Sequence, residues 1–230
     1  MTLASAPRSL FRLPGRPAPV LVALVAVSAL PELVLQAADL GLVGTPRWRL
    51  LAYQYGAFWA GLLHNWRPNF ALQPWTMFLT YAVLHAGIGH LAGNMLTLVL
   101  LGQPLAARLG PWRFLCVYAG GTLGGAAAFG LMTASPQPMV GASGALFGLA
   151  GAFIARDWRQ RRRQGRPAGP VLAVLAGLVL LNLLIWLALG GMLAWETHLG
   201  GFLAGAGIAV ALGGRGPAPI PPDRASGDPS

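Results

Sequence analysis

The chain has 230 residues, of which 55% are hydrophobic and only 10% are charged. A soluble domain carries about 25% charged residues, so this composition excludes a protein whose whole surface faces water. The net charge of +10 comes from 16 basic residues, all of them arginine, which lie in short clusters between apolar tracts. The cluster "RDWRQRRRQGR" at 156–166 suits RNA or acidic lipid, but a positively charged cytoplasmic loop between two spans is the favoured interpretation, so no nucleic-acid partner is expected.

Apolar tracts of about 20 residues cross a bilayer as helices, and they recur along nearly the whole chain. The first tract covers residues 19–41 and contains Pro31 and Glu32. A signal peptide is the alternative, but apolar sequence continues past Glu32 and no clear small-residue cleavage site follows. We predict a first transmembrane helix that is kinked at Pro31, with Glu32 near the outer boundary or facing the bundle.

Residues 44–80 differ in kind, because Trp and Arg alternate there with apolar residues. Such amphipathic pieces suit a segment that lies in the membrane interface. This segment holds half of the eight tryptophans of the chain, namely Trp48, Trp59, Trp66 and Trp75.

Five more apolar tracts follow, at approximately 82–105, 113–133, 141–156, 169–190 and 197–213. The sequence therefore predicts an all-α polytopic membrane protein with six spans in one domain, residues 18–213. Residues 1–17 are predicted to be a cytoplasmic segment and residues 214–230 a disordered cytoplasmic tail. The arginine distribution predicts that both termini are cytoplasmic, since the loops after the third and fifth spans contain no arginine.

The fourth tract holds the serine of greatest interest, Ser143, in the otherwise apolar run "MVGASGALFGLAGAF". From Gly141 to Arg156 a helix would be only about 22 Å long, against a hydrocarbon core of about 30 Å. We therefore predict a short fourth helix whose first residues, including Ser143, lie below the outer membrane surface. Backbone N–H groups at that depth are tolerated only in the protein interior or in a wet cavity.

Three spans bring polar side chains to the same level. "HAGIGHLAGN" places His85, His90 and Asn94 near the start of the second span, and "ETHLGGFLAG" places His198 at the start of the sixth. Close helix packing explains the small residues beside them, Gly144, Gly148, Gly201 and Gly205. Packing does not explain two histidines and an asparagine at one depth.

These residues could serve a metal site or a nucleophilic serine. A zinc site is disfavoured, because no H-E-x-x-H occurs and His85 and His90 would lie about 140° apart around a helix. The remaining option is a serine nucleophile with a histidine base. No carboxylate is available in the late spans to orient His198, so the pair would be a dyad, with His90 and Asn94 as donors to a developing oxyanion.

These motifs resemble the rhomboid family of intramembrane serine proteases over roughly residues 19–213. The resemblance rests on "HAGIGHLAGN" as H-x4-H-x3-N, on "GASG" as G-x-S-G and on "HLGGFLAG" as H-x2-G-x3-G, in that order along the chain. It implies that Ser143 is the nucleophile, His198 the general base, and His90 with Asn94 the oxyanion side chains. His85, Gly141, Gly144, Gly201 and Gly205 would be supporting residues.

The resemblance also implies that Phe147 packs against the ring of His198. Some relatives have a tyrosine at this position, so a hydroxyl is lacking here. A second departure precedes the second span, where relatives often carry Trp-Arg and this chain reads "QPWTMFLTYAVLH".

We therefore expect an integral, multi-pass protein, in a bacterial inner (cell) membrane, that cleaves transmembrane segments of other proteins without a metal or cofactor. Its substrates would be single-span or other transmembrane proteins with helix-destabilising, small-residue sites. The alternative is a catalytically silent relative that binds membrane clients. A transporter or channel is disfavoured, because the spans lack the charged residues that such a pathway needs.

Overall fold

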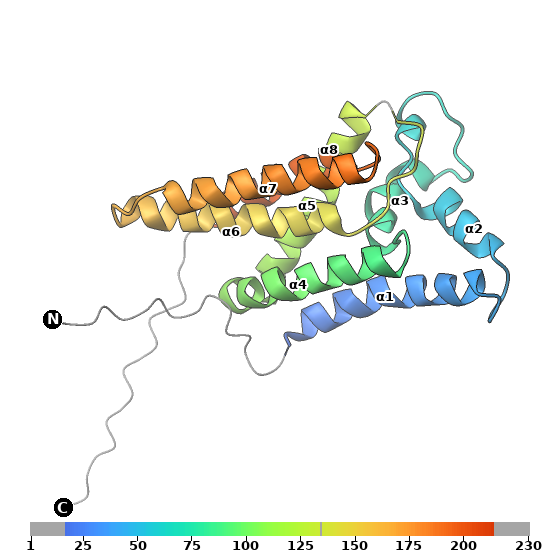
Figure 1. Cartoon of the computed structure of the whole chain (residues 1–230), viewed down its shortest axis with the longest axis horizontal. Coiled ribbons are helices and arrows are strands. Elements are labelled where there is room, and N and C mark those ends of the chain that lie inside the picture. The colour runs from blue at the N-terminus through green and yellow to red at the C-terminus, as the bar shows by residue number, and fades with distance from the viewer. Residues whose placement is uncertain (1–16, 134, 214–230) are drawn as a thin grey trace, which may run out of the picture.

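The computed structural model describes residues 17–133 and 135–213 (Figure 1). These residues form helices joined by short loops. In chain order the helices are α1 (Pro19–Asp39), α2 (Arg47–Gly56), α3 (Gln73–Thr80), α4 (Ile88–Leu109), α5 (Pro111–Met132), α6 (Ser143–Arg163), α7 (Gly169–Ala188) and α8 (Trp195–Ala211), with short 3-10 turns η1 (Ala60–Leu63) and η2 (Tyr81–Val83). The predicted cytoplasmic segment, apart from its last residue, and the predicted tail lie outside the described residues.

The long helices match the six apolar tracts in position. Three of them, α1, α5 and α7, are long and apolar enough to cross a membrane, and a fourth span arises if α3–η2 and α4, which are bent by 81°, are taken together. The second half of α6 is rich in arginine and α8 has only 17 residues. The chain is therefore an integral membrane protein by its apolar helices, whereas the count of six spans stays a prediction.

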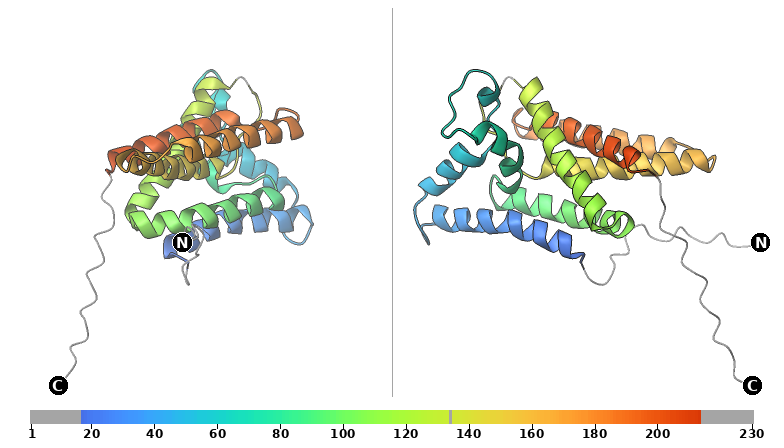
Figure 2. Two further views of the ribbon diagram at one scale, coloured as in Figure 1. Left: turned by 60° about the vertical axis from the view of Figure 1, so that its left-hand side comes forward. Right: turned by 180° about the vertical axis from the view of Figure 1, so that it is seen from behind.

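The helices are arranged around an oblique α5 (Figures 1 and 2). Helices α1 and α4 lie side by side in one layer, and α6, α7 and α8 form another. Helix α5 crosses between these layers and packs mainly on α6 and α8. The main core lies where α4, α5 and α6 meet and includes Leu98, Leu105, Phe114, Val117 and Leu149.

A second core supports the loop that precedes α6. It contains Phe58, Met77, Tyr81, Phe129 and Met139, all nearly inaccessible to solvent. The ring of Phe58 meets the rings of Tyr81 and Phe129 edge to face, with centroids 6.1 and 5.9 Å apart. The segment predicted to lie in the interface, residues 44–80, thus folds into α2, η1 and α3 and packs on α5.

Two predictions about helix boundaries were wrong. The fourth helix is not short, because α6 has 21 residues and continues to Arg163. Arginine and glutamine favour the helix, and Arg161 donates to Asp157 one turn earlier at 2.7 Å. Only its apolar part is short, so most of the predicted loop at 156–166 is helical.

The second helix also begins later than predicted, at Ile88, so His85 lies in the loop before it. Gly87, with φ of 97°, precedes the helix in a conformation that side-chain-bearing residues rarely adopt. The expectation that His85 and His90 share one helix is therefore wrong.

Candidate functional site

Ser143 is the first residue of α6, and the loop before it is held by backbone hydrogen bonds. Met139 and Phe58 form an isolated antiparallel bridge, with N–H···O distances of 2.9 and 3.0 Å. Two residues later the N–H of Gly141 donates to the carbonyl of Tyr81 at 2.9 Å. The first N–H groups of a helix have no partner within the helix, so this anchored loop presents free backbone donors next to Ser143.

The start of α6 packs closely against α8. A Cβ atom on Gly201 would overlap the carbonyl of Gly144, and one on Gly205 would overlap the carbonyl of Gly148. A Cβ on Gly144 would lie 2.9 Å from Thr197 Cγ2 and 2.9 Å from the Tyr81 hydroxyl. These predicted supporting glycines therefore let the backbones approach without side chains between them.

His198 lies in the first turn of α8, and its ring is nine-tenths buried. Phe147, one turn after Ser143, stacks on this ring with centroids 4.2 Å apart and 9° between the planes. The predicted contact between Phe147 and His198 is thus present. Ser143 and Phe147 are four residues apart and lie on the same face of α6.

His90 and Asn94 converge on Gly141, two residues before Ser143. A Cβ on Gly141 would lie 2.9 Å from His90 Nε2 and 3.5 Å from Asn94 Nδ2, and its φ is 120°, so glycine suits the position on both counts. The N–H of Ala86 donates to His90 Nδ1 at 3.3 Å, which leaves the proton of a neutral ring on Nε2. Asn94 Nδ2 is buried without a hydrogen-bond partner among the described residues. Two donors therefore point to the same place.

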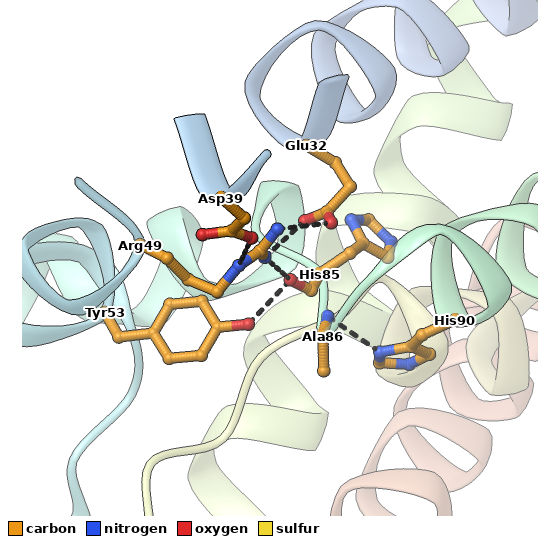
Figure 3. Close-up of polar contacts among 7 residues, drawn as sticks. All are labelled: Glu32, Asp39, Arg49, Tyr53, His85, Ala86 and His90. Atoms are coloured by element: carbon orange, nitrogen blue, oxygen red, sulfur yellow. Dashed lines mark hydrogen bonds and ion pairs between the residues drawn. The ribbon is translucent and has the colours of Figure 1, made fainter. Parts of the chain in front are cut away.

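An ion-pair network anchors the loop that contains His85 (Figure 3). Arg49 of α2 donates to both oxygens of the fully buried Glu32 of α1, each at 2.9 Å, and to Asp39 at 2.6 Å. Arg49 Nη1 and the Tyr53 hydroxyl also donate to the carbonyl of His85, at 3.2 and 2.7 Å. Glu32 thus faces the bundle, which is one of its two predicted positions.

The network affects the protonation of Arg49 and Tyr53. Hydrogen bonds to Glu32 raise the pKa of Arg49 above its usual range, and burial raises the pKa of Tyr53. Arg49 therefore stays charged and Tyr53 stays a hydroxyl donor at any physiological pH. The loop before α4 is thus held by an arginine of α2.

The His85 side chain itself lies inside this arrangement. Its ring is fully buried, contacts the ring of His90 at a centroid distance of 5.4 Å, and has no hydrogen-bond partner on either nitrogen among the described residues. Within the described part of the chain, no three His, Cys, Asp or Glu side chains gather closely enough to hold a metal ion.

Asn182 was not expected at the site. It lies on α7, and its Oδ1 is 2.5 Å from His198 Nδ1. The sequence signal was an amide within the long apolar run 169–190, since polar groups in membrane helices are costly and often functional. The structure thus gathers around the α6 N-terminus the predicted residues of α4 and α8, together with one residue of α7.

Comparison with known proteins identifies the family of the chain. The family model for the rhomboid domain matches residues 72–215, which is more than half of the chain. Rhomboid protease GluP of Bacillus subtilis is 37% identical over 140 residues, covering 60% of this chain and 26% of that protein. The match to the family model includes all the helices from α3 to α8.

Other relatives come from distant organisms. Rhomboid-related protein 3 of Homo sapiens is 29% identical over 159 residues, covering 64% of this chain and 38% of that protein. Rhomboid-type serine protease 2 of Emericella nidulans is 25% identical over 143 residues, covering 60% and 27%. The matches thus span less than two fifths of the length of these relatives. With the family domain matched over most of its helical body, the chain belongs to the rhomboid family.

Proposed function

We propose that this protein is an intramembrane serine endopeptidase, with Ser143 as nucleophile and His198 as general base. The observation that carries the proposal is the convergence of Phe147, stacked on His198, with His90 and Asn94 at the loop leading into Ser143. The protease names of several relatives support the same reaction class. The assignment of the six-span topology belongs to this proposal as well.

The chemistry follows from the side chains. Ser143 Oγ attacks the scissile carbonyl carbon while its proton passes to His198 Nε2, and the carbonyl oxygen becomes an oxyanion. His90 Nε2–H, Asn94 Nδ2 and the backbone N–H groups at the start of α6 donate to that oxyanion. His198 then protonates the leaving amine, the acyl-enzyme forms, and water releases the second product by the reverse sequence of proton transfers.

The substrate class follows from the location of the serine in an apolar bundle. We infer that the substrates are single-span or other transmembrane proteins. A peptide bond in a helix is protected by its hydrogen bonds, so cleavage is expected at small or helix-destabilising residues. No metal or cofactor takes part in the proposed steps.

The test is the Ser143→Ala variant, purified in detergent and given a single-span reporter substrate. We expect cleavage to be abolished while expression and melting temperature are unchanged. A serine-directed fluorophosphonate should label the unmodified protein and not the variant. Retained proteolysis in Ser143→Ala would contradict the assignment of Ser143 as the nucleophile of this enzyme. If the unmodified protein binds the reporter without cleaving it, the alternative is favoured, namely a catalytically silent relative that binds membrane clients.

The double variant refines the assignment. His198→Ala should be as damaging as Ser143→Ala, and the double variant no worse than either, because residues that act as one unit are not additive. Full activity of His198→Ala would place the base elsewhere, with His90 the next candidate.

The proposed membrane orientation has both termini in the cytoplasm of a bacterial cell. The arginines at the end of α6 support it, since cytoplasmic loops are enriched in positive charge. A topology reporter fused after Gln164 should respond as cytoplasmic. A periplasmic response would reverse the orientation and with it the depth assigned to Ser143.

A further inference from the structure

Asn182 is the one amide side chain of α7, and both ends of that amide are bonded. Its Nδ2 donates to the carbonyl of Leu178, one turn earlier, at 2.9 Å. Its Oδ1 faces His198 Nδ1. A backbone carbonyl can only accept, so the NH2 end of the amide must face Leu178, and the oxygen end is left for the histidine.

This arrangement determines the tautomer of His198. Oδ1 of an amide is an acceptor and carries no proton, so His198 Nδ1 must be the donor. In a neutral imidazole the other nitrogen, Nε2, then holds a lone pair. A lone pair on Nε2 is the state that a general base needs in order to take a proton.

Two contacts restrain different motions of the same ring. The parallel ring of Phe147 restricts tilting of the His198 plane. The bond from Asn182 restricts rotation of the ring within that plane, because Nδ1 must keep pointing at a fixed oxygen. Together they leave the ring one orientation and one tautomer.

The hydrogen bond also crosses between helices that otherwise pack lightly. Within the fully described α7, Val171 is the one buried residue, and it lies three turns before Asn182. An amide in such an apolar helix is unfavourable unless it is paired. The bond to His198 therefore accounts for the presence of Asn182 at a position where an aliphatic residue would be expected.

We propose that Asn182 is a positioning residue that holds His198 as the Nδ1–H tautomer with Nε2 directed to Ser143. This inference rests on the proposed function and extends the dyad to a three-residue chain of Ser143, His198 and Asn182. The amide takes the place that an acidic residue has in soluble serine hydrolases.

The first test reads the tautomer directly and does not depend on activity. The chain has only 4 histidines, so nitrogen-15 labelling of histidine gives few signals, and His198→Ala identifies the one from His198. In the unmodified protein we expect a proton on Nδ1 and none on Nε2. In Asn182→Leu, which keeps the branched shape of the side chain but removes both the oxygen and the NH2 group of the amide, we expect a mixture of tautomers. A proton on Nε2 in the unmodified protein, or an unchanged tautomer in Asn182→Leu, overturns the proposal.

The second test separates positioning from stability by kinetics. Asn182→Leu should lower kcat by roughly ten-fold, the rate equivalent of one hydrogen bond, with KM nearly unchanged. Asn182→Asp should recover most of that loss, since a carboxyl group in either protonation state keeps an acceptor oxygen. Leu184→Ala, at an exposed position of the same helix, is the matched control and should keep full activity.

The outcomes distinguish the two proposals. If Ser143→Ala is inactive but Asn182→Leu keeps its kcat, the role of Asn182 fails and the serine protease assignment stands. If Asn182→Leu has a lower melting temperature but an unchanged kcat, the residue is structural and the positioning role is wrong. The same conclusion follows if Asn182→Asp is as slow as Asn182→Leu. If Ser143→Ala stays active, the proposed function fails, while the tautomer measurement still decides what Asn182 does to His198.

Discussion

The ring of Phe147 lies parallel to the ring of His198, with a distance of 4.2 Å between the centroids and an angle of 9° between the planes. Phe147 belongs to α6 and His198 to α8, so the stack joins the helix that begins with Ser143 to the helix that carries the proposed base. Apolar contact and ring stacking thus act on a polar side chain whose function depends on its orientation.

Phe147→Ala should therefore lower kcat by several-fold, because an aromatic pair contributes about 0.5–1.5 kcal/mol beyond area burial. Phe147→Tyr should retain most of the activity, since it keeps the ring. The control is Phe153→Ala, which removes a half-buried ring further along the same helix. Equal rate losses in the two alanine variants would mean that the stack has no specific role.

Asn94→Ala should lower turnover with little change in substrate affinity or melting temperature. Its Nδ2 is buried and has no partner among the described residues, so little native-state bonding by that donor is lost. A donor that acts only on the developing oxyanion stabilises the transition state by about 2.7–4 kcal/mol. His90→Ala should behave similarly, because its Nε2 approaches the same glycine.

Turnover, apparent affinity and melting temperature of the Asn94 and His90 variants should be measured on one detergent preparation. Thr97→Ala, on the same helix, provides a control, since its hydroxyl only donates to the carbonyl of Gly93. A loss of stability without a loss of rate would remove Asn94 from the proposed site.

Gly201→Ala should destabilise the protein by about 1–3 kcal/mol, the usual effect of overpacking a tight contact. The added methyl group would overlap the carbonyl of Gly144, which is backbone and cannot rotate away. Gly207→Ala is a matched control on the same helix, because a Cβ there meets no atom within 4 Å. In thermal unfolding in detergent, Gly201→Ala should have a clearly lower melting temperature than Gly207→Ala. Equal melting temperatures would contradict the close approach of α6 and α8.

Arg49→Met should destabilise the protein by about 3 kcal/mol, since it leaves the buried carboxyl group of Glu32 without its arginine partner. This value is at the low end for a broken buried ion pair, because the Arg49 side chain is 20% exposed and solvent weakens its interaction with Glu32. Adding Glu32→Gln should restore part of the loss by removing the buried carboxyl group. Arg47→Met, at an exposed position of α2, is the control and should be nearly neutral in the same unfolding experiment.

The positions of the long helices could be predicted because apolar tracts separated by polar or glycine- and proline-containing segments run along the chain. Local boundaries were harder to predict. The extension of α6 to Arg163 depends on helix propensity and on the pair between Arg161 and Asp157, which act equally well outside the apolar region. The late start of α4 depends on Gly87, whose backbone conformation has no hydropathy signal.

The candidate residues could be predicted where polar side chains interrupt apolar tracts in pairs or at regular spacing. Partners that are distant in sequence could not. No regular sequence spacing predicts that Glu32 pairs with Arg49 or that His198 pairs with Asn182. A lone asparagine in an apolar helix signals only that some partner exists, and the position of α7 relative to His198 decides which one.

The glycine contacts among α5, α6 and α8 constrain how the sequence can change over evolution. A Cβ on Gly148 would lie 2.7 Å from the Cα of Gly121, while Gly148 itself leaves no room for a Cβ on Gly205. Enlarging any one of these residues pushes on backbone of another helix, so a single substitution cannot be absorbed by a neighbouring rotamer. A second substitution on the facing helix cannot make room, because the residue there is already glycine, so drift at these positions would require the helix backbones to move apart. The exposed residues of α7, by contrast, are free to exchange one aliphatic side chain for another.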